Sequence, residues 1–235
     1  MRADRLALCF FVSSTLGACD GAALAPTAAD TIVEATGASD APFHDPSRAL
    51  DGVQGAGHGA GSLDVYSIDY GTHLVLGWAG RRVVDGPGAE LVVFENPFTF
   101  GDGRTFMDPT IVEVSIDGAS WVAFPHDYLA QDETLYSSDA DDWAGFAGVT
   151  PVLLHDETNP VDPFDAAAAG GDAFDIATLP TEGLGGRVRE EGFAFVRLSA
   201  AADHVNPDTG DRYPRDPVAN GPDIDGVIAR HLVDQ

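Results

Sequence analysis

The chain has 235 residues, with 38 acidic and 12 basic side chains and a formal net charge of −26. Every basic residue is an arginine, since the sequence contains no lysine. So large an acidic excess excludes nucleic acid as a partner, because phosphate binding requires Lys and Arg to displace counterions, and it disfavours adsorption to anionic lipid headgroups.

Residues 1–18 have the features of a bacterial secretion signal. A short basic start precedes a mostly apolar run over residues 6–16, which is too short to span a bilayer. The run ends in Leu-Gly-Ala-Cys at 16–19, which resembles the lipobox of bacterial lipoproteins, where the signal is cleaved before the cysteine and the thiol is acylated. The alternative is an ordinary secretory signal with a chance cysteine. We therefore expect lipid on Cys19 to anchor an exported protein to the cell envelope, at the outer membrane or cell surface.

Residues 19–30 predict a short lipidated tether, and residues 31–235 predict one domain. The only cysteines are Cys9, inside the signal, and Cys19, so the domain contains no disulfide. Its stability must therefore come from its core or from metal ions. No segment after the signal is long and apolar enough to be a transmembrane helix.

Most of the domain is predicted to form short β-strands. The expected strands cover residues 31–35, 63–68, 73–78, 90–94, 111–116, 120–124, 193–199 and 224–231. Val112, Val114 and Ile116 alternate with polar residues, which is typical of a half-buried strand. Asp117-Gly118 between two such runs predicts a hairpin. Many short strands separated by Gly and Pro turns predict an all-β sandwich.

A long irregular insertion interrupts this pattern at residues 125–191. It contains fifteen acidic residues and little periodicity. A stretch of this kind inside a compact domain is usually functional or disordered, and its aromatic residues argue against full disorder. The best helical candidates are short, at residues 46–50 and 163–169.

Several short motifs follow one another in a fixed order. They are Asp-Gly-Pro-Gly at 85–88 with Val-Phe-Glu-Asn-Pro-Phe at 93–98, Val-Glu-Val-Ser at 112–115, Ala-Gly-Val-Thr-Pro-Val at 147–152, Gly-Gly-Asp-Ala-Phe-Asp-Ile at 170–176 and Asp-Ile-Asp-Gly-Val at 223–227. Together they resemble the signature of a family of bacterial cell-surface proteins and lipoproteins of largely unknown function. The resemblance covers residues 31–231. Pro222 and Gly226 depart from the family pattern, which has Phe and Ala at these places.

A more distant similarity concerns the fold. Ala-Leu-Asp-Gly at 49–52, the hairpin around Trp121 and Phe-Val-Arg-Leu at 195–198 are similar to discoidin-type modules. These modules are galactose-binding-like jelly-roll sandwiches. The similarity implies a jelly-roll β-sandwich whose end loops carry a ligand site, often with a calcium site beside it, and whose first loop meets the last strand.

Three acidic residues near the two ends of the domain are candidate calcium ligands. Calcium binds about six to eight oxygens from carboxylates, amides and backbone carbonyls. Asp51 lies in a glycine-rich turn, while Asp223 and Asp225 stand two residues apart at the head of a strand, so that both carboxylates are expected on one face. If the first loop meets the last strand, Asp51 and Asp225 share an ion. The alternative is that Asp51 caps a turn and Asp225 accepts backbone N–H bonds.

Two further pairs are candidate metal ligands. Glu95 and Asn96 end a buried strand, where a carboxylate must be paired, hydrogen-bonded or bound to a metal. Asp172 and Asp175 follow two glycines, where backbone oxygens can converge. Structural bracing is an equal alternative for both pairs.

The sequence lacks the common catalytic motifs. It contains neither His-Glu-x-x-His nor Gly-x-Ser-x-Gly, and its glycine-rich turn lacks the Lys-Ser/Thr of a phosphate loop. A carboxylate pair for glycoside hydrolysis needs proximity only in space and stays open. Trp143, with Tyr136 nearby in the insertion, is the candidate aromatic for stacking on a sugar ring; packing of the insertion is the alternative role.

These features predict a non-enzymatic, monomeric cell-envelope lipoprotein. Its calcium-braced β-sandwich is expected to bind a surface ligand, with glycan as the expected class. One alternative is an accessory or hydrolytic domain that acts on polysaccharide through carboxylates of residues 125–191. The other is a structural or adhesive surface protein.

Overall fold

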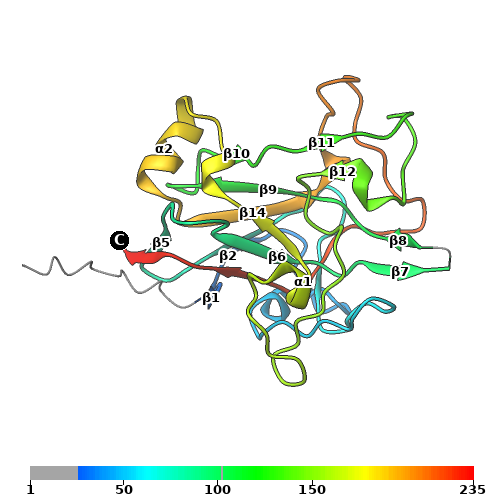
Figure 1. Cartoon of the computed structure of the whole chain (residues 1–235), viewed down its shortest axis with the longest axis horizontal. Helices are drawn as coiled ribbons and strands as arrows, with labels where there is room; N and C mark the ends of the chain where they lie inside the picture. The colour runs from blue at the N-terminus through cyan, green and yellow to red at the C-terminus, as the bar shows by residue number, and fades with distance from the viewer. Residues whose placement is uncertain (1–25, 102) are drawn as a thin grey trace, which may run out of the picture.

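Two antiparallel sheets organise the part of the chain that the computed structural model describes, which comprises residues 26–101 and 103–235 (Figure 1). The four-stranded sheet has the order β1 (Thr27–Ala28), β16 (Gly226–Ala229), β6 (Leu91–Phe94) and β13 (Asp172–Phe174). The last strand of this sheet comes from the predicted insertion. The insertion therefore takes part in the sandwich.

The five-stranded sheet contains the two longest strands. Its order is β10 (Val122–Ala123), β9 (Thr110–Ser115), β14 (Phe195–Ala200), β4 (Leu74–Gly77) and β2 (Thr31–Ala35). Strands β9 and β14 pair over their full length, so the centre of this sheet is formed by segments about eighty residues apart in sequence.

One apolar core lies between the two sheets. From the five-stranded sheet it includes Leu74, Leu76, Val112, Val114, Val196 and Leu198, and from the four-stranded sheet Leu91, Val93, Phe174, Val227 and Ala229. These residues alternate along their strands with side chains on the opposite face, as the period of a strand requires. Because two sheets enclose a shared core, the prediction of an all-β sandwich is confirmed.

Four further strand pairs form separate two-stranded sheets. They are β3 (Tyr66–Ser67) with β15 (Asp223–Ile224), β5 (Arg81–Val83) with β17 (Leu232–Asp234), β7 (Phe98–Phe100) with β8 (Arg104–Phe106), and β11 (Asp127–Tyr128) with β12 (Trp143–Ala144). In Figure 1 the β7–β8 hairpin lies at the end of the molecule opposite the C-terminus.

The hairpin predicted at Asp117-Gly118 is present between β9 and β10, but its loop is wider than a two-residue turn. Val122 pairs with Val114, and the Asp117 carboxylate accepts N–H bonds from Ala119 and Ser120 at 2.9 Å each. The loop residues are thus held by a side chain rather than by a tight backbone turn.

Helices are short. They are η1 (Pro46–Ala49), η2 (Ala140–Asp142), α1 (Ala166–Ala169), η3 (Ile176–Thr178), α2 (Gly183–Glu191) and η4 (Ala201–Asp203). The sequence does not predict α2, because its glycines have low helix propensity. Gly185 and Gly186 are nevertheless needed there, since a Cβ on either would lie within 2.6 Å of a backbone oxygen of the preceding turn.

Part of the insertion packs against neighbouring segments in a separate apolar cluster. This cluster contains Met107, Ile111, Tyr128, Trp143, Phe146, Ala201 and Tyr213. The aromatic rings contact one another edge to face or tilted, with the Tyr128 and Trp143 centroids 4.1 Å apart. Aromatic burial thus orders a region that has little sequence periodicity.

Candidate functional sites

The carboxylate of Glu95 lies buried at the end of β6. Its Oε1 accepts the Asp223 N–H at 2.8 Å, while its Oε2 has no hydrogen-bond partner among the described residues. Gly148, at φ 78°, leaves the room for this group, because a Cβ there would lie 3.1 Å from Oε2. Glu95 is therefore an acid with one satisfied and one free oxygen.

Two further acids surround Glu95, and we call Glu95, Asp108 and Asp223 the Glu95 group. Burial and the neighbouring Asp108 charge raise the pKa of Glu95 well above its usual range. Burial, followed by the charges of Asp223 and Asp216, raises the pKa of Asp108 to about 7. Asp223 accepts the Ser67 hydroxyl, and burial raises its pKa. The group concentrates negative charge in a place with little water to stabilise it.

The Asn96 side chain lies between this group and the loop before β3, and its hydrogen bond to Asp223 partly offsets the rise in the pKa of that acid. Its Oδ1 accepts the Ser62 N–H and its Nδ2 donates to the Ser62 carbonyl at 3.0 Å. Both functions of the amide are thus used to hold the loop before β3. These contacts fit structural bracing, the alternative to metal binding for Asn96.

A second acidic group centres on Asp225, which is fully buried. Its Oδ1 accepts the Gln54 N–H at 2.9 Å, and its Oδ2 has no partner within the described ranges. Burial, with the charges of Asp64, Asp156 and Asp51, raises the pKa of Asp225 to about 7. We call these four acids the Asp225 group. The structure thus brings Asp51 into electrostatic range of Asp225.

The outer part of the Asp225 group has partial charge compensation. Arg48 pairs with Asp64 and lies 3.8 Å from Asp51, and Gln54 Nε2 donates to Asp64. Asp51 keeps 42% of its side chain exposed, so the group reaches the surface. The innermost member, Asp225, has no salt bridge among the described residues.

Asp223 and Asp225 do not face the same site, which corrects the expectation drawn from their spacing. Asp223 contacts Ser67 in the Glu95 group, whereas Asp225 contacts Gln54 in the other group. The alternation fails because Asp225 lies between two strands with different partners: β15 pairs with β3, and β16 pairs with β6.

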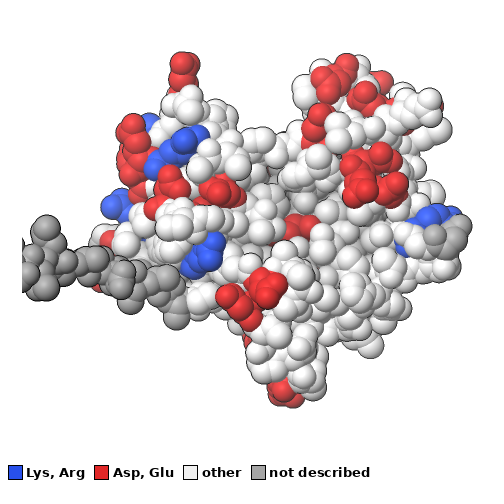
Figure 2. Space-filling model, viewed as in Figure 1, with Lys and Arg blue, Asp and Glu red and all other residues white. Residues whose placement is uncertain are grey.

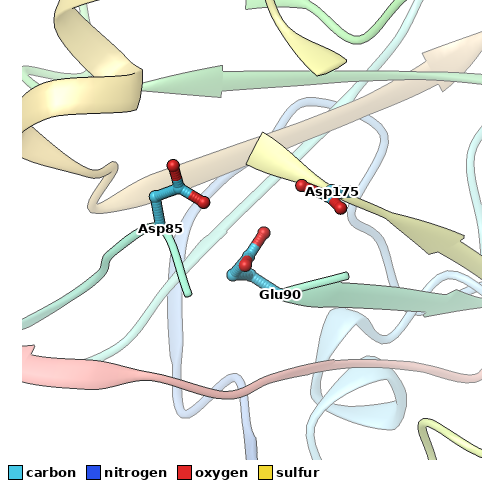
Figure 3. Close-up of side chains that lie close together, drawn as sticks. All are labelled: Asp85, Glu90 and Asp175. Carbon is cyan, nitrogen blue, oxygen red and sulfur yellow. The ribbon is translucent and has the colours of Figure 1, made fainter. Parts of the chain in front are cut away.

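A third acidic cluster is the tightest. Asp85, Glu90 and Asp175 are the only three acids, histidines or cysteines in residues 26–101 and 103–235 whose ligand atoms lie within 4.8 Å of one another (Figure 3). Glu90 is buried, and its two oxygens accept the Gly86 N–H at 3.0 Å and the Ile176 N–H at 2.8 Å. Burial raises the pKa of Glu90 to about 7.

The Asp85 cluster works mainly as a brace. Both Glu90 oxygens already accept backbone donors, and Asp175 caps η3 by accepting the Ala177 N–H at 2.7 Å. Asp172 is held separately: its Oδ2 accepts N–H bonds from Val149 and Thr150 at 3.1 and 3.4 Å. The predicted pair Asp172 and Asp175 therefore has separate hydrogen-bond partners.

The aromatic residues predicted to stack on a ligand pack within the insertion. Trp143 is only 1% exposed, and its Nε1 donates to the Ser137 carbonyl at 2.9 Å. Tyr136 is partly buried and donates its hydroxyl to the Met107 carbonyl at 2.7 Å. The expectation that Trp143 is exposed for sugar stacking is wrong, because the aromatic cluster of the insertion buries it; packing is its role.

Sequence patterns do not single out Asp64, Asp108 or Asp156. Each is one of 38 acidic residues, and its importance arises from neighbours that the fold brings in from distant segments. Acidic side chains also occur in several separate patches on the face seen in Figure 2. No local signal distinguishes the three from these surface acids.

Cys19 and the whole of residues 1–25 lie outside the described residues. Within residues 26–101 and 103–235, no helix has the length and apolar character needed to cross a membrane. No protein-family model, no curated protein and no solved structure matches the chain.

Proposed function

We propose that the chain is a non-enzymatic binding protein of the bacterial cell envelope, anchored by lipid on Cys19 and braced by calcium. The supporting observation is that Asp225 Oδ2 and Glu95 Oε2 are buried and have no partner among the described residues. A buried carboxylate of this kind is neutralised by a proton or by a cation. Calcium fits because it binds carboxylate and carbonyl oxygens in flexible geometry.

The Asp225 group is the better of the two sites. Asp51 and Asp156 are exposed at its edge, so an ion has an entry path, and Asp64 offers a further carboxylate. No three acids of the group lie close enough for immediate coordination, so binding requires side-chain rotation at the exposed members. The ion would stabilise the otherwise uncompensated charge of Asp225 and tie the first loop to the last strands.

Thermal denaturation of residues 20–235 at neutral pH tests the calcium brace. We expect a higher melting temperature in calcium than in chelator, and a smaller effect of magnesium, which demands rigid octahedral geometry. An ion that binds only the folded state adds about 2.7 kcal/mol at one hundred times its dissociation constant. Asp225→Asn should abolish this increment.

Asp172→Asn is the matched control. Its carboxylate accepts two backbone N–H bonds outside both groups, so this variant should shift the melting temperature by the same amount in calcium and in chelator. Identical melting temperatures of the native chain in calcium and in chelator would contradict the calcium brace. The buried carboxylates would then be neutralised by protons.

The lipid anchor is tested in the full chain. Native protein expressed in a bacterium should fractionate with membranes and incorporate labelled palmitate. Cys19→Ser should lose both properties, while Cys9→Ser, inside the signal, should keep them. Soluble native protein without label would contradict the anchor.

A second candidate function is hydrolysis of polysaccharide. Asp172 and Asp175 line a cavity of about 380 Å³ with Phe124, Phe146 and Phe174, and burial raises the pKa of Asp172 to about 6. Glycoside hydrolysis by general acid catalysis uses a carboxylic acid with a raised pKa and a second carboxylate beside it. Reducing-sugar release from bacterial polysaccharides, lost in Asp175→Asn, would favour this candidate over a binding role.

A further inference from the structure

A polar cavity of about 350 Å³ lies on the outer face of the five-stranded sheet, and none of its lining residues belongs to the three acidic clusters. The residues that define its chemistry are Glu113, Arg197, Ser199, Asp203, His204 and Arg212. Its volume falls in the range of small-molecule sites, about 300–1,000 Å³. Glu113 comes from β9, and Arg197 and Ser199 come from β14, which pairs with β9 over the full length of both strands, while the other three residues follow β14 in the chain.

Glu113 and Arg197 form the floor of this cavity. They are direct cross-strand partners, and both Nε and Nη2 of Arg197 lie 2.7 Å from Glu113 Oε2. The guanidinium also lies over the Trp121 ring, 4.6 Å from its centroid. Two independent contacts thus fix the plane of Arg197. Within the described part of the chain, Glu113 Oε1 and Arg197 Nη1 have no hydrogen-bond partner.

Ser199 and His204 add a second fixed pair. The Ser199 hydroxyl and His204 Nε2 are 2.7 Å apart. Burial lowers the pKa of His204, so the ring is neutral at pH 7, and with Nε2 bonded to Ser199 its Nδ1 is left for a further hydrogen bond. Together the two residues present hydrogen-bonding groups of both kinds in fixed orientations.

The charges of the cavity balance. Arg197 opposes Glu113, and Arg212 at the exposed rim lies 3.7 Å from Asp203. This balance contrasts with the net charge of −26 of the whole chain. A lining with two cations, two anions and neutral donor–acceptor groups does not select an ionic ligand. It suits a neutral molecule with several hydroxyl groups, each of which donates one hydrogen bond and accepts others.

We propose that this cavity binds a neutral sugar residue of a surface glycan, with Glu113 accepting and Arg197 donating hydrogen bonds to its hydroxyls. The assignment rests on the proposed binding function and names its ligand class, but it does not depend on the calcium brace. Charge-assisted hydrogen bonds from a preorganised pair give such a site its orientation and specificity.

An array of neutral and acidic glycans, probed with the chain from residue 20 onward, tests the assignment. The best-bound neutral glycan is then titrated by calorimetry. We expect Arg197→Lys and Glu113→Gln to weaken binding at least tenfold, because each removes fixed hydrogen-bonding atoms, and Ser199→Ala to weaken it less. Arg187→Ala, an exposed arginine on α2, is the matched control and should leave binding unchanged.

The outcomes separate the two proposals. Failure to bind any neutral glycan, binding of acidic glycans alone, or binding that Glu113→Gln, Arg197→Lys and Ser199→Ala all leave intact would overturn the cavity assignment. Melting curves of the same variants show whether each is folded. If calcium still stabilises the chain and Cys19 still anchors it, the envelope proposal survives the loss of the cavity assignment. If both of those tests fail while sugar binding is intact, the cavity assignment stands and the calcium brace and lipid anchor do not.

Discussion

On the outer face of the five-stranded sheet, Glu113 meets Arg197 across neighbouring strands, whereas at the strand ends Asp225 meets only other acids and backbone. Both carboxylates are largely shielded from water. The pKa of Asp225 is raised by burial and by Asp64, Asp156 and Asp51, and within the described residues one of its oxygens has no partner.

The difference shows which shielded carboxylates are paired with an arginine in this acidic protein and which are not. Arginine is placed where the sheet needs a fixed polar surface, as at Glu113, while Asp225 is left to neutralisation from solution. The first arrangement needs no ion or proton from solution to compensate its charge. The second should make stability depend on pH and, under the proposed calcium brace, on cations. Each of the following predictions tests this contrast.

The largest effect is expected for Asp225→Asn in chelator. A rise in pKa from 3.8 to about 7 is equivalent to about 4 kcal/mol against the charged form. Because the folded pKa lies above the unfolded one, the folded state binds the extra proton, and stability present near pH 4 is lost as the pH rises through about 7. The variant should therefore gain stability at pH 8, with a smaller gain at pH 5, as measured by denaturant unfolding.

Calcium should reverse the sign of that result. With the ion bound, the native Asp225 charge is compensated, so Asp225→Asn should destabilise at pH 8. A variant that is less stable than the native chain at pH 8 in chelator as well would show that the carboxylate already has a partner, and the contrast with Glu113 would fail.

The intermediate effect is expected at Glu113 and Arg197. Glu113→Gln removes the charge but keeps the shape, and it leaves the guanidinium with only the Trp121 face as a strong partner. We expect a loss of about 1–2 kcal/mol, between the values for a charged hydrogen bond and an exposed ion pair. The sign is opposite to that of Asp225→Asn in chelator.

A double-mutant cycle with Arg197→Met checks the cause. If the pair itself is responsible, the combined variant should lose less than the sum of the single losses. Strict additivity would mean that each residue stabilises the sheet through packing alone, and the difference between the two regions would then not concern charge compensation.

The strands that form the core follow from sequence because their signal is local. Val112 and Val114 alternate with polar neighbours, and the apolar run 90–94 is short and β-branched; the structure places β9 and β6 within one residue of these predictions. Helix α2 has no local signal in the sequence, since Gly185 and Gly186 are required by close contact with the preceding backbone and have low helix propensity.

The sites follow from sequence only in part. Local context marks Asp51 and Asp225 as candidate ligands, and the resemblance implies that they meet. The fold brings them into one group, but Asp64 and Asp156 join it from segments with no distinguishing pattern. Trp143 illustrates the opposite failure: its acidic flanks suggest exposure, yet rings from Tyr128, Phe146 and the distant Tyr213 surround it. Such burial is a property of tertiary packing.

The smallest effect is expected for the exposed pair Arg187–Glu191 on α2, where the guanidinium Nε lies 3.1 Å from the carboxylate. Both side chains are more than 40% exposed, so water screens the charges, and an i,i+4 pair of this kind contributes about 0.3–0.5 kcal/mol. Glu191→Gln should therefore change the unfolding midpoint little, and less still at high salt. A loss of stability as large as that of Glu113→Gln would contradict this expectation. It would mean that an Arg–Glu pair contributes equally to stability in water and on the shielded face of the sheet, whatever its exposure.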